Sequence, residues 1–78
     1  MFKDTVEFIV KSLVDHPDDV EVHQDGSATS IILEVTVNED DTGRVIGRGG
    51  RVINAIRVVI QSLAAREGKR VSLEVLSD

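Results

Sequence analysis

Residues 43–53 read GRVIGRGGRVI, with four glycines and three arginines in eleven positions. We expect a short helical turn that ends at Gly47 and a longer helix that begins near Arg51. Glycine removes side-chain bulk, so backbone amides at such a junction can approach an anion closely, and the start of the second helix adds free N–H groups. The stretch therefore predicts a phosphate cradle, flanked by the full charges of Arg48 and Arg51.

The glycines do not fit either of the common nucleotide-binding motifs. A P-loop needs G-x-x-x-x-G-K-[ST], but the sixth position counted from Gly43 is Arg48. A dinucleotide fingerprint that starts at Gly47 needs a glycine where Val52 stands. What fits is the G-x-x-G tetrapeptide of residues 47–50, GRGG, which is uninformative alone and gains meaning only from the elements around it.

Hydrophobic periodicity predicts a helix and then a β-hairpin in the N-terminal part. Apolar residues recur every three or four positions over residues 2–14, and the helix is expected to stop before Pro17. We expect Phe2 and Phe8 in the core. Residues 19–37 alternate apolar and polar side chains on both sides of an Asp-Gly turn signal, which predicts two paired strands.

The C-terminal part predicts a long helix and a last strand. Gly68 is well placed to end the helix, and residues 70–76 alternate as a strand does. The chain thus divides into a helix and hairpin (1–37), a helix–loop–helix unit (42–67) and a final strand (70–76), in the order α-β-β-α-α-β. The connection between the last two strands is long enough for a parallel crossover. The apolar stripe expected on the long helix is Val52, Ile53, Ile56, Val59, Ile60 and Leu63.

An acidic, turn-prone link joins the hairpin to the short helix. It contains Glu39, Asp40 and Asp41 in succession, but it lacks the alternating ligands and the glycine of a calcium loop. We therefore expect a solvated loop or charge at a helix N-terminus, with Asp41 or Thr42 as the cap, and no metal site.

The charge of the chain is divided between two regions. The formal net charge is -5, from 14 acidic and 9 basic residues, which argues against a general nucleic-acid binder. However, residues 1–43 sum to -9, whereas residues 44–70 sum to +6. Partners respond to the local potential within a Debye length of about 8 Å. The basic segment is either an ordinary solvated helix surface or an anion-binding region.

Several function classes are excluded by composition. With no cysteine, the chain has no disulfide, thiolate zinc site or cysteine nucleophile. Acids interrupt the first ten residues, and no apolar run approaches the roughly 20 residues of a membrane span, so we expect a cytoplasmic protein. No acid–base pair or nucleophile–base arrangement stands out, so we expect no enzyme activity, no cofactor and no metal.

The G-x-x-G in its context resembles the KH domain. Residues 45–56, VIGRGGRVINAI, place the tetrapeptide between two helices with strands outside them. Residues 8–20, FIVKSLVDHPDDV, and 43–48, GRVIGR, are also similar to the small stand-alone bacterial KH proteins of the KhpA family, formerly YlqC. This resemblance covers essentially the whole sequence.

The resemblance implies an α+β fold, a single type II KH domain with a three-stranded mixed sheet packed on helices. It implies a cytoplasmic protein that binds single-stranded RNA with low sequence specificity and clamps the backbone of about four nucleotides. An RNA chaperone or post-transcriptional regulator would work in this way. The family further implies a homodimer, pairing with a larger multidomain KH protein, and a link to cell elongation and division, hence to cell shape.

Residues 47–50 are expected to hold the sugar–phosphate backbone, with charge from Arg48 and Arg51. The resemblance also implies an apolar groove whose floor involves Val45, Ile46, Ile53 and the second strand, although plain core packing is the favoured interpretation of Ile46 and Ile53. Family members often carry a larger residue than Gly49, so this loop should be more flexible and its affinity weak. The candidate RNA-binding residues are Arg44, Ile46, Gly47, Arg48, Gly49, Gly50, Arg51, Ile53 and Arg57.

Two features of the long helix have another interpretation. The cations Arg66, Lys69 and Arg70 at its far end complement the helix dipole. Residues 55–65 also carry more small apolar surface than one core face needs. The alternative function is therefore a protein-assembly module that dimerises, and a dimer with two loops would gain avidity. The residues of this surface are Ala55, Val58, Val59, Ser62, Ala64 and Ala65.

Overall fold

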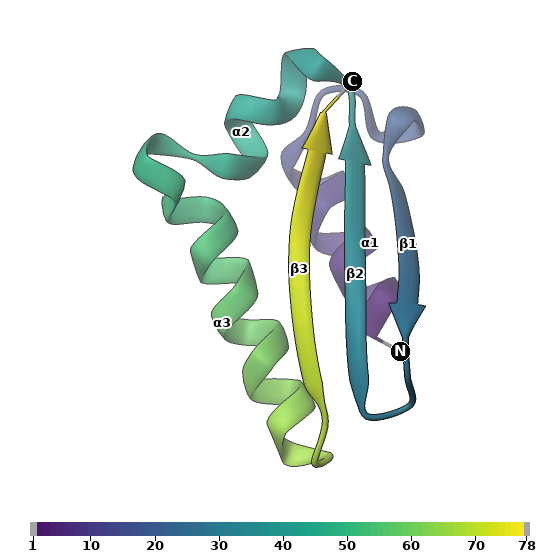
Figure 1. The fold of residues 1–78 in the computed structure, drawn as a ribbon. Helices are drawn as coiled ribbons and strands as arrows, with labels where there is room; N and C mark the ends of the chain where they lie inside the picture. Colours follow the sequence, from purple (N-terminus) through teal and green to yellow (C-terminus); the bar gives the residue numbers. More distant parts are fainter. Residues whose placement is uncertain (1, 78) are drawn as a thin grey trace.

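A computed structural model describes residues 2–77 of the chain. Three α-helices and three strands alternate with short 3-10 turns, and the expected order α-β-β-α-α-β is confirmed (Figure 1). The elements are α1 (Phe2–Leu13), η1 (Pro17–Asp19), β1 (Glu21–Gly26), β2 (Ser30–Val37), η2 (Glu39–Asp41), α2 (Thr42–Ile46), η3 (Arg48–Gly50), α3 (Arg51–Arg66) and β3 (Arg70–Ser77).

The strands form one mixed sheet in the order β1-β2-β3. β1 pairs antiparallel with β2, with Val22 opposite Val35, and β2 pairs parallel with β3, with Leu33 opposite Leu73. Figure 1 shows α1 behind the sheet and α3 running alongside β3. The parallel pair follows from the helical crossover, because a strand that returns through α2 and α3 enters the sheet in the same direction as β2.

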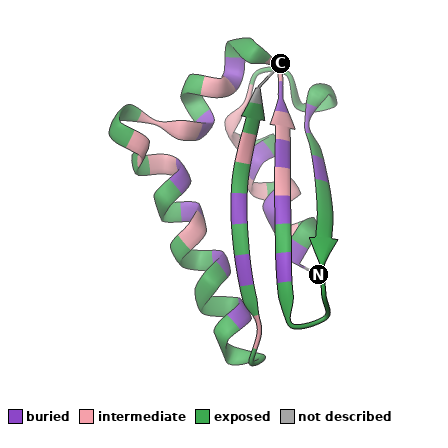
Figure 2. Cartoon of the chain, viewed as in Figure 1, coloured by how far each residue is buried: buried purple, intermediate pink, exposed green. Residues whose placement is uncertain are grey.

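One face of the sheet and one side of each long helix form the core (Figure 2). Side chains alternate across a strand, so every second residue of β2 is buried while its neighbours face solvent. With no disulfide, this packing holds the fold, and each large aliphatic side chain that is fully buried contributes roughly 1.5–3 kcal/mol. The buried apolar residues are Phe2, Val6, Val10, Val20, Val22, Ile31, Leu33, Val35, Val37, Val45, Ile53, Ile56, Ile60, Ala64, Val71 and Leu73.

Three expectations for the helices are wrong. Phe8 is 74% exposed, because it lies about 200° around α1 from the buried Val6. Val59 and Leu63 are exposed by 49% and 39%, so the buried stripe of α3 is narrower than expected. Ala64 is fully buried, and it therefore does not belong to a surface that a second copy could contact.

In the acidic link, Asp41 is buried, although a solvated position or a helix cap was expected for it. Asp41 is 1% exposed, and its two carboxylate oxygens accept hydrogen bonds from the backbone N–H groups of Asp15 (3.1 Å) and His16 (3.0 Å). The chain leaving α1 passes over the start of α2 and leaves these two amides without helical partners. Asp41 therefore ties the end of α1 to the helix–loop–helix unit, and its side chain makes no cap on α2.

Candidate nucleic-acid interface

The G-x-x-G loop is a tight turn between two helices. α2 ends at Ile46 and is capped by Gly47, which has φ 76°, and the following turn contains Gly49 with φ 64° and Gly50 with φ 80°. These positive φ values are the left-handed region, where a Cβ atom is strained. Glycine at these three positions lets the backbone change direction within four residues and start α3 directly at Arg51.

The loop glycines differ in what surrounds them. A Cβ atom on Gly47 would lie 2.5 Å from Cγ2 of Val52 and 2.8 Å from its backbone N, so the loop packs against the first turn of α3. At Gly49 nothing lies within 4 Å of the position of a Cβ. The loop is therefore anchored at its first residue and open to a ligand at its third.

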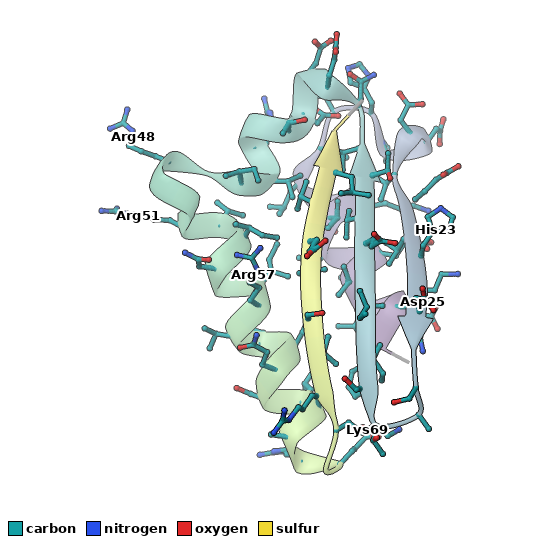
Figure 3. The ribbon with its side chains drawn as sticks, viewed as in Figure 1. His23, Asp25, Arg48, Arg51, Arg57 and Lys69 are labelled. Atoms are coloured by element: carbon teal, nitrogen blue, oxygen red, sulfur yellow. The ribbon has the colours of Figure 1, made fainter. Side chains whose placement is uncertain are left out.

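Arg48 and Arg51 both project from the loop away from the body of the molecule (Figure 3). Both are exposed, and they are separated by only two glycines. Their guanidinium groups carry full charges that a planar fork can direct at phosphate oxygens. The sequence placed the same two arginines beside the loop.

Arg44 lies one turn before the loop and is partly engaged. Its Nη2 atom lies 3.3 Å from Oδ2 of Asp15, and both side chains are more than half exposed. An exposed ion pair of this kind is worth only about 0–1 kcal/mol. Arg44 can thus turn to a phosphate at small cost, but Asp15 competes for it.

Arg57 is held in place by two acceptors. Its Nε atom donates to the backbone oxygen of Leu73 on β3 (3.0 Å), and Nη1 donates to Oδ1 of Asn54 (2.9 Å). Figure 3 shows the side chain between α3 and β3. The sequence predicted Arg57 as a secondary RNA-binding residue. In the structure its side chain also links α3 to β3 at the edge of the sheet.

The apolar candidates lie mostly in the core. Val45 is fully buried and Ile53 is 3% exposed, whereas Ile46 is half-buried. For Ile53 this agrees with core packing, the favoured interpretation. The strand beside α2 and α3 is β3, so the expected position of the second strand in the groove floor is wrong (Figure 1). β2 occupies the centre of the sheet because β3 pairs on its far side.

The exposed face of the sheet is acidic. Glu21, Glu34 and Glu74 lie on it, since each neighbours buried residues that point to the helices. Glu34 and Glu74 are register partners on adjacent parallel strands, and His23 faces Glu34 from β1. The alternation of β2 and β3 was visible in the sequence, but the pairing that gathers these acids was not.

Within residues 2–77, no group of three or more His, Asp or Glu side chains is arranged to hold a metal ion. Among the same residues, no helix is long and apolar enough to cross a membrane.

Comparison with known proteins identifies close relatives. The family model described as KhpA/KhpB, KH domain, matches residues 3–75. The chain is 47% identical to "RNA-binding protein KhpA" of Clostridium perfringens, over 95% of this chain and 99% of the relative. Identity is 49% to the protein of the same name in Clostridium acetobutylicum, with the same shares, and 41% in Chlamydia trachomatis, over 97% of each chain. No solved structure gives a significant match.

Proposed function

This chain belongs to the KhpA/KhpB family of KH domains, and from that premise we propose that it binds single-stranded RNA through the G-x-x-G loop. The observation that carries the proposal is the open loop of residues 47–50, with Arg48 and Arg51 projecting beside it. The relatives that match nearly the full chain are named as RNA-binding proteins.

The loop and its arginines would hold the sugar–phosphate backbone. Contacts to phosphate fix the position of a strand but carry no sequence information, so low sequence specificity follows. Base stacking on aromatic rings contributes little, because the chain has only two Phe and no Tyr or Trp. One of these two, Phe2, is buried in the core.

The acidic surface elsewhere limits where RNA can bind. Residues 1–43 sum to -9, and the exposed face of the sheet contributes part of that charge. RNA is repelled from these regions and attracted to the basic segment that contains the loop, so binding is local, salt-sensitive and modest. A weak, sequence-tolerant binder that meets many transcripts in the bacterial cytoplasm would suit an RNA chaperone or a post-transcriptional regulator.

The test replaces the positive charge of Arg48 and fills the open space at Gly49 in one variant. The double variant Arg48→Asp, Gly49→Asp should abolish crosslinking of the protein to RNA in cells, while circular dichroism reports an unchanged fold. The double variant Arg66→Asp, Gly68→Asp is the matched control, because it makes the same charge change at an exposed arginine and an open glycine near the other end of α3. Undiminished crosslinking of the loop variant would remove the loop from the binding site.

The second proposed function is self-association through α3. Val58, Val59 and Leu63 are exposed by 62%, 49% and 39% on one helix, which is more apolar surface than a solvated helix needs. The homodimer would carry two loops and gain avidity for one RNA. We assign the same surface to pairing with a larger multidomain KH protein.

Light scattering tests the homodimer. The protein should be dimeric at high micromolar concentration, and Val58→Asp should make it monomeric without unfolding it. Ala28→Asp, at an exposed residue of the connection between β1 and β2 and away from α3 in the sequence, serves as the control. A wild-type protein that stays monomeric at that concentration contradicts the assignment.

A further inference from the structure

A second cationic site lies at the end of α3 farthest from the loop. A hollow of about 350 Å³ opens there between α3 and the start of β3. Two of its lining residues, Lys69 and Arg70, are basic, and none is acidic. The residues that line it are Gln61, Ala65, Lys69, Arg70 and Val71.

The hollow and Arg57 lie on the same side of α3. Arg57, Gln61 and Ala65 follow one another at intervals of four residues, so their side chains form one row along the helix. Arg57 bonds to the oxygen of Leu73, which shows that this row faces β3. A seam between α3 and β3 therefore runs from the region of the loop, past Arg57, to the hollow.

We propose that RNA held at the loop continues along this seam and places a second stretch of its backbone at the hollow, against Arg70. This inference rests on the proposed function and extends its site. From Arg51 to Ala65 the helix rises about 21 Å. At a stacked spacing of about 3.4 Å, that distance needs about six nucleotides beyond those at the loop.

Arg70 is the principal cation of the second site. Its side chain is exposed, and its backbone N–H donates to the oxygen of Thr29 (2.8 Å), which fixes the first residue of β3. Lys69 is more engaged, because its ammonium lies 3.6 Å from a carboxylate oxygen of Glu67 and 6.0 Å from the ring centre of Phe2.

Acidic residues on the sheet restrict the path of the RNA to the seam. Glu34 and Glu74 lie on the exposed face of the sheet, four positions along their strands from the pair Ser30 and Arg70 at the start of β3. Phosphates that leave the loop are repelled from that face and attracted to Arg57 and Arg70. Only a polymer tethered at the loop reaches a high local concentration at such an open hollow, which favours RNA over a free anion.

The test measures affinity against RNA length. Fluorescence anisotropy with oligouridylates of 4 and 12 nucleotides should show that Arg70→Glu weakens binding of the 12-mer by about fivefold and leaves the 4-mer unchanged. Arg70→Gln should act in the same direction with a smaller effect, which provides a second variant if charge reversal disturbs β3.

Arg66→Glu is the matched control. It makes the same charge change, but Arg66 does not line the hollow and lies about 180° around α3 from Arg57 and about 100° from Ala65. Equal losses in Arg66→Glu and Arg70→Glu, or an equal loss for both oligomers, would overturn the inference. If Arg48→Asp abolishes binding while Arg70→Glu spares the 12-mer, only the second site fails. If neither oligomer binds the wild type, the proposed function fails with it.

Discussion

Gly47 and Val52 lie so close together that a Cβ atom on Gly47 would stand 2.5 Å from Cγ2 of Val52. The first glycine of the G-x-x-G loop is thus part of the packing between the loop and α3. Gly49, two residues later, has open space around it. One loop therefore combines a position that the fold requires with a position that is available to a ligand.

Replacement of Gly47 by alanine should destabilise the fold. The added methyl group crowds Val52, which costs about 1–3 kcal/mol. Alanine must also adopt φ 76°, which costs about 1–2 kcal/mol more, so we expect a total loss of about 2–5 kcal/mol in the free energy of unfolding by urea. Gly49→Ala is the control, with only the backbone cost of about 1–2 kcal/mol. Val52→Ala should recover part of the Gly47→Ala loss. Equal losses at the two glycines, with no recovery, would contradict this account.

Asp41→Asn should cost about 1–3 kcal/mol of stability, because an amide has one acceptor oxygen for two backbone N–H groups and leaves a buried group unpaired. Denaturant unfolding measures it. Asp40→Asn makes the same change at an exposed neighbour and should be nearly neutral. Matching midpoints for the two variants would mean that the contact to Asp15 and His16 is not stabilising.

Asp15→Asn should strengthen RNA binding. Removal of this carboxylate releases Arg44, and we expect affinity for a short oligouridylate to rise by up to about fivefold at low salt. The gain should shrink as salt increases. Asp18→Asn, an equal charge change at an exposed residue of η1, separates the specific effect from a general one. The same gain in both variants would assign it to net charge alone.

The salt dependence of binding should count the phosphate contacts. For single-stranded nucleic acid, the slope of log K against log salt is about -0.7 for each neutralised phosphate. Contacts from Arg48 and Arg51 to a 4-mer give a slope near -1.4, and Arg51→Gln should reduce it to near -0.7. An unchanged slope in Arg51→Gln would show that this side chain contacts no phosphate.

Much of the fold could be predicted because the signals are local. The 3.6-residue period of α1 and α3, the alternation of β2 and the glycines of residues 47–50 each act within one element or turn. Those signals also placed Arg48 and Arg51 beside the loop. They failed at Phe8 and at Val59, because a hydrophobic residue near an apolar stripe is buried only when a neighbouring element covers it.

The order of the elements and the position of the loop follow from local sequence alone. The period of the hydrophobic residues and the need for glycine where φ is positive are properties of a short stretch of chain. They do not depend on how the rest of the molecule packs. The tertiary structure alone decided that Asp41 is buried against Asp15 and His16, and that Arg57 reaches the edge of β3 at Leu73. These contacts join residues 16 to 26 positions apart, and their energies depend on how whole elements pack.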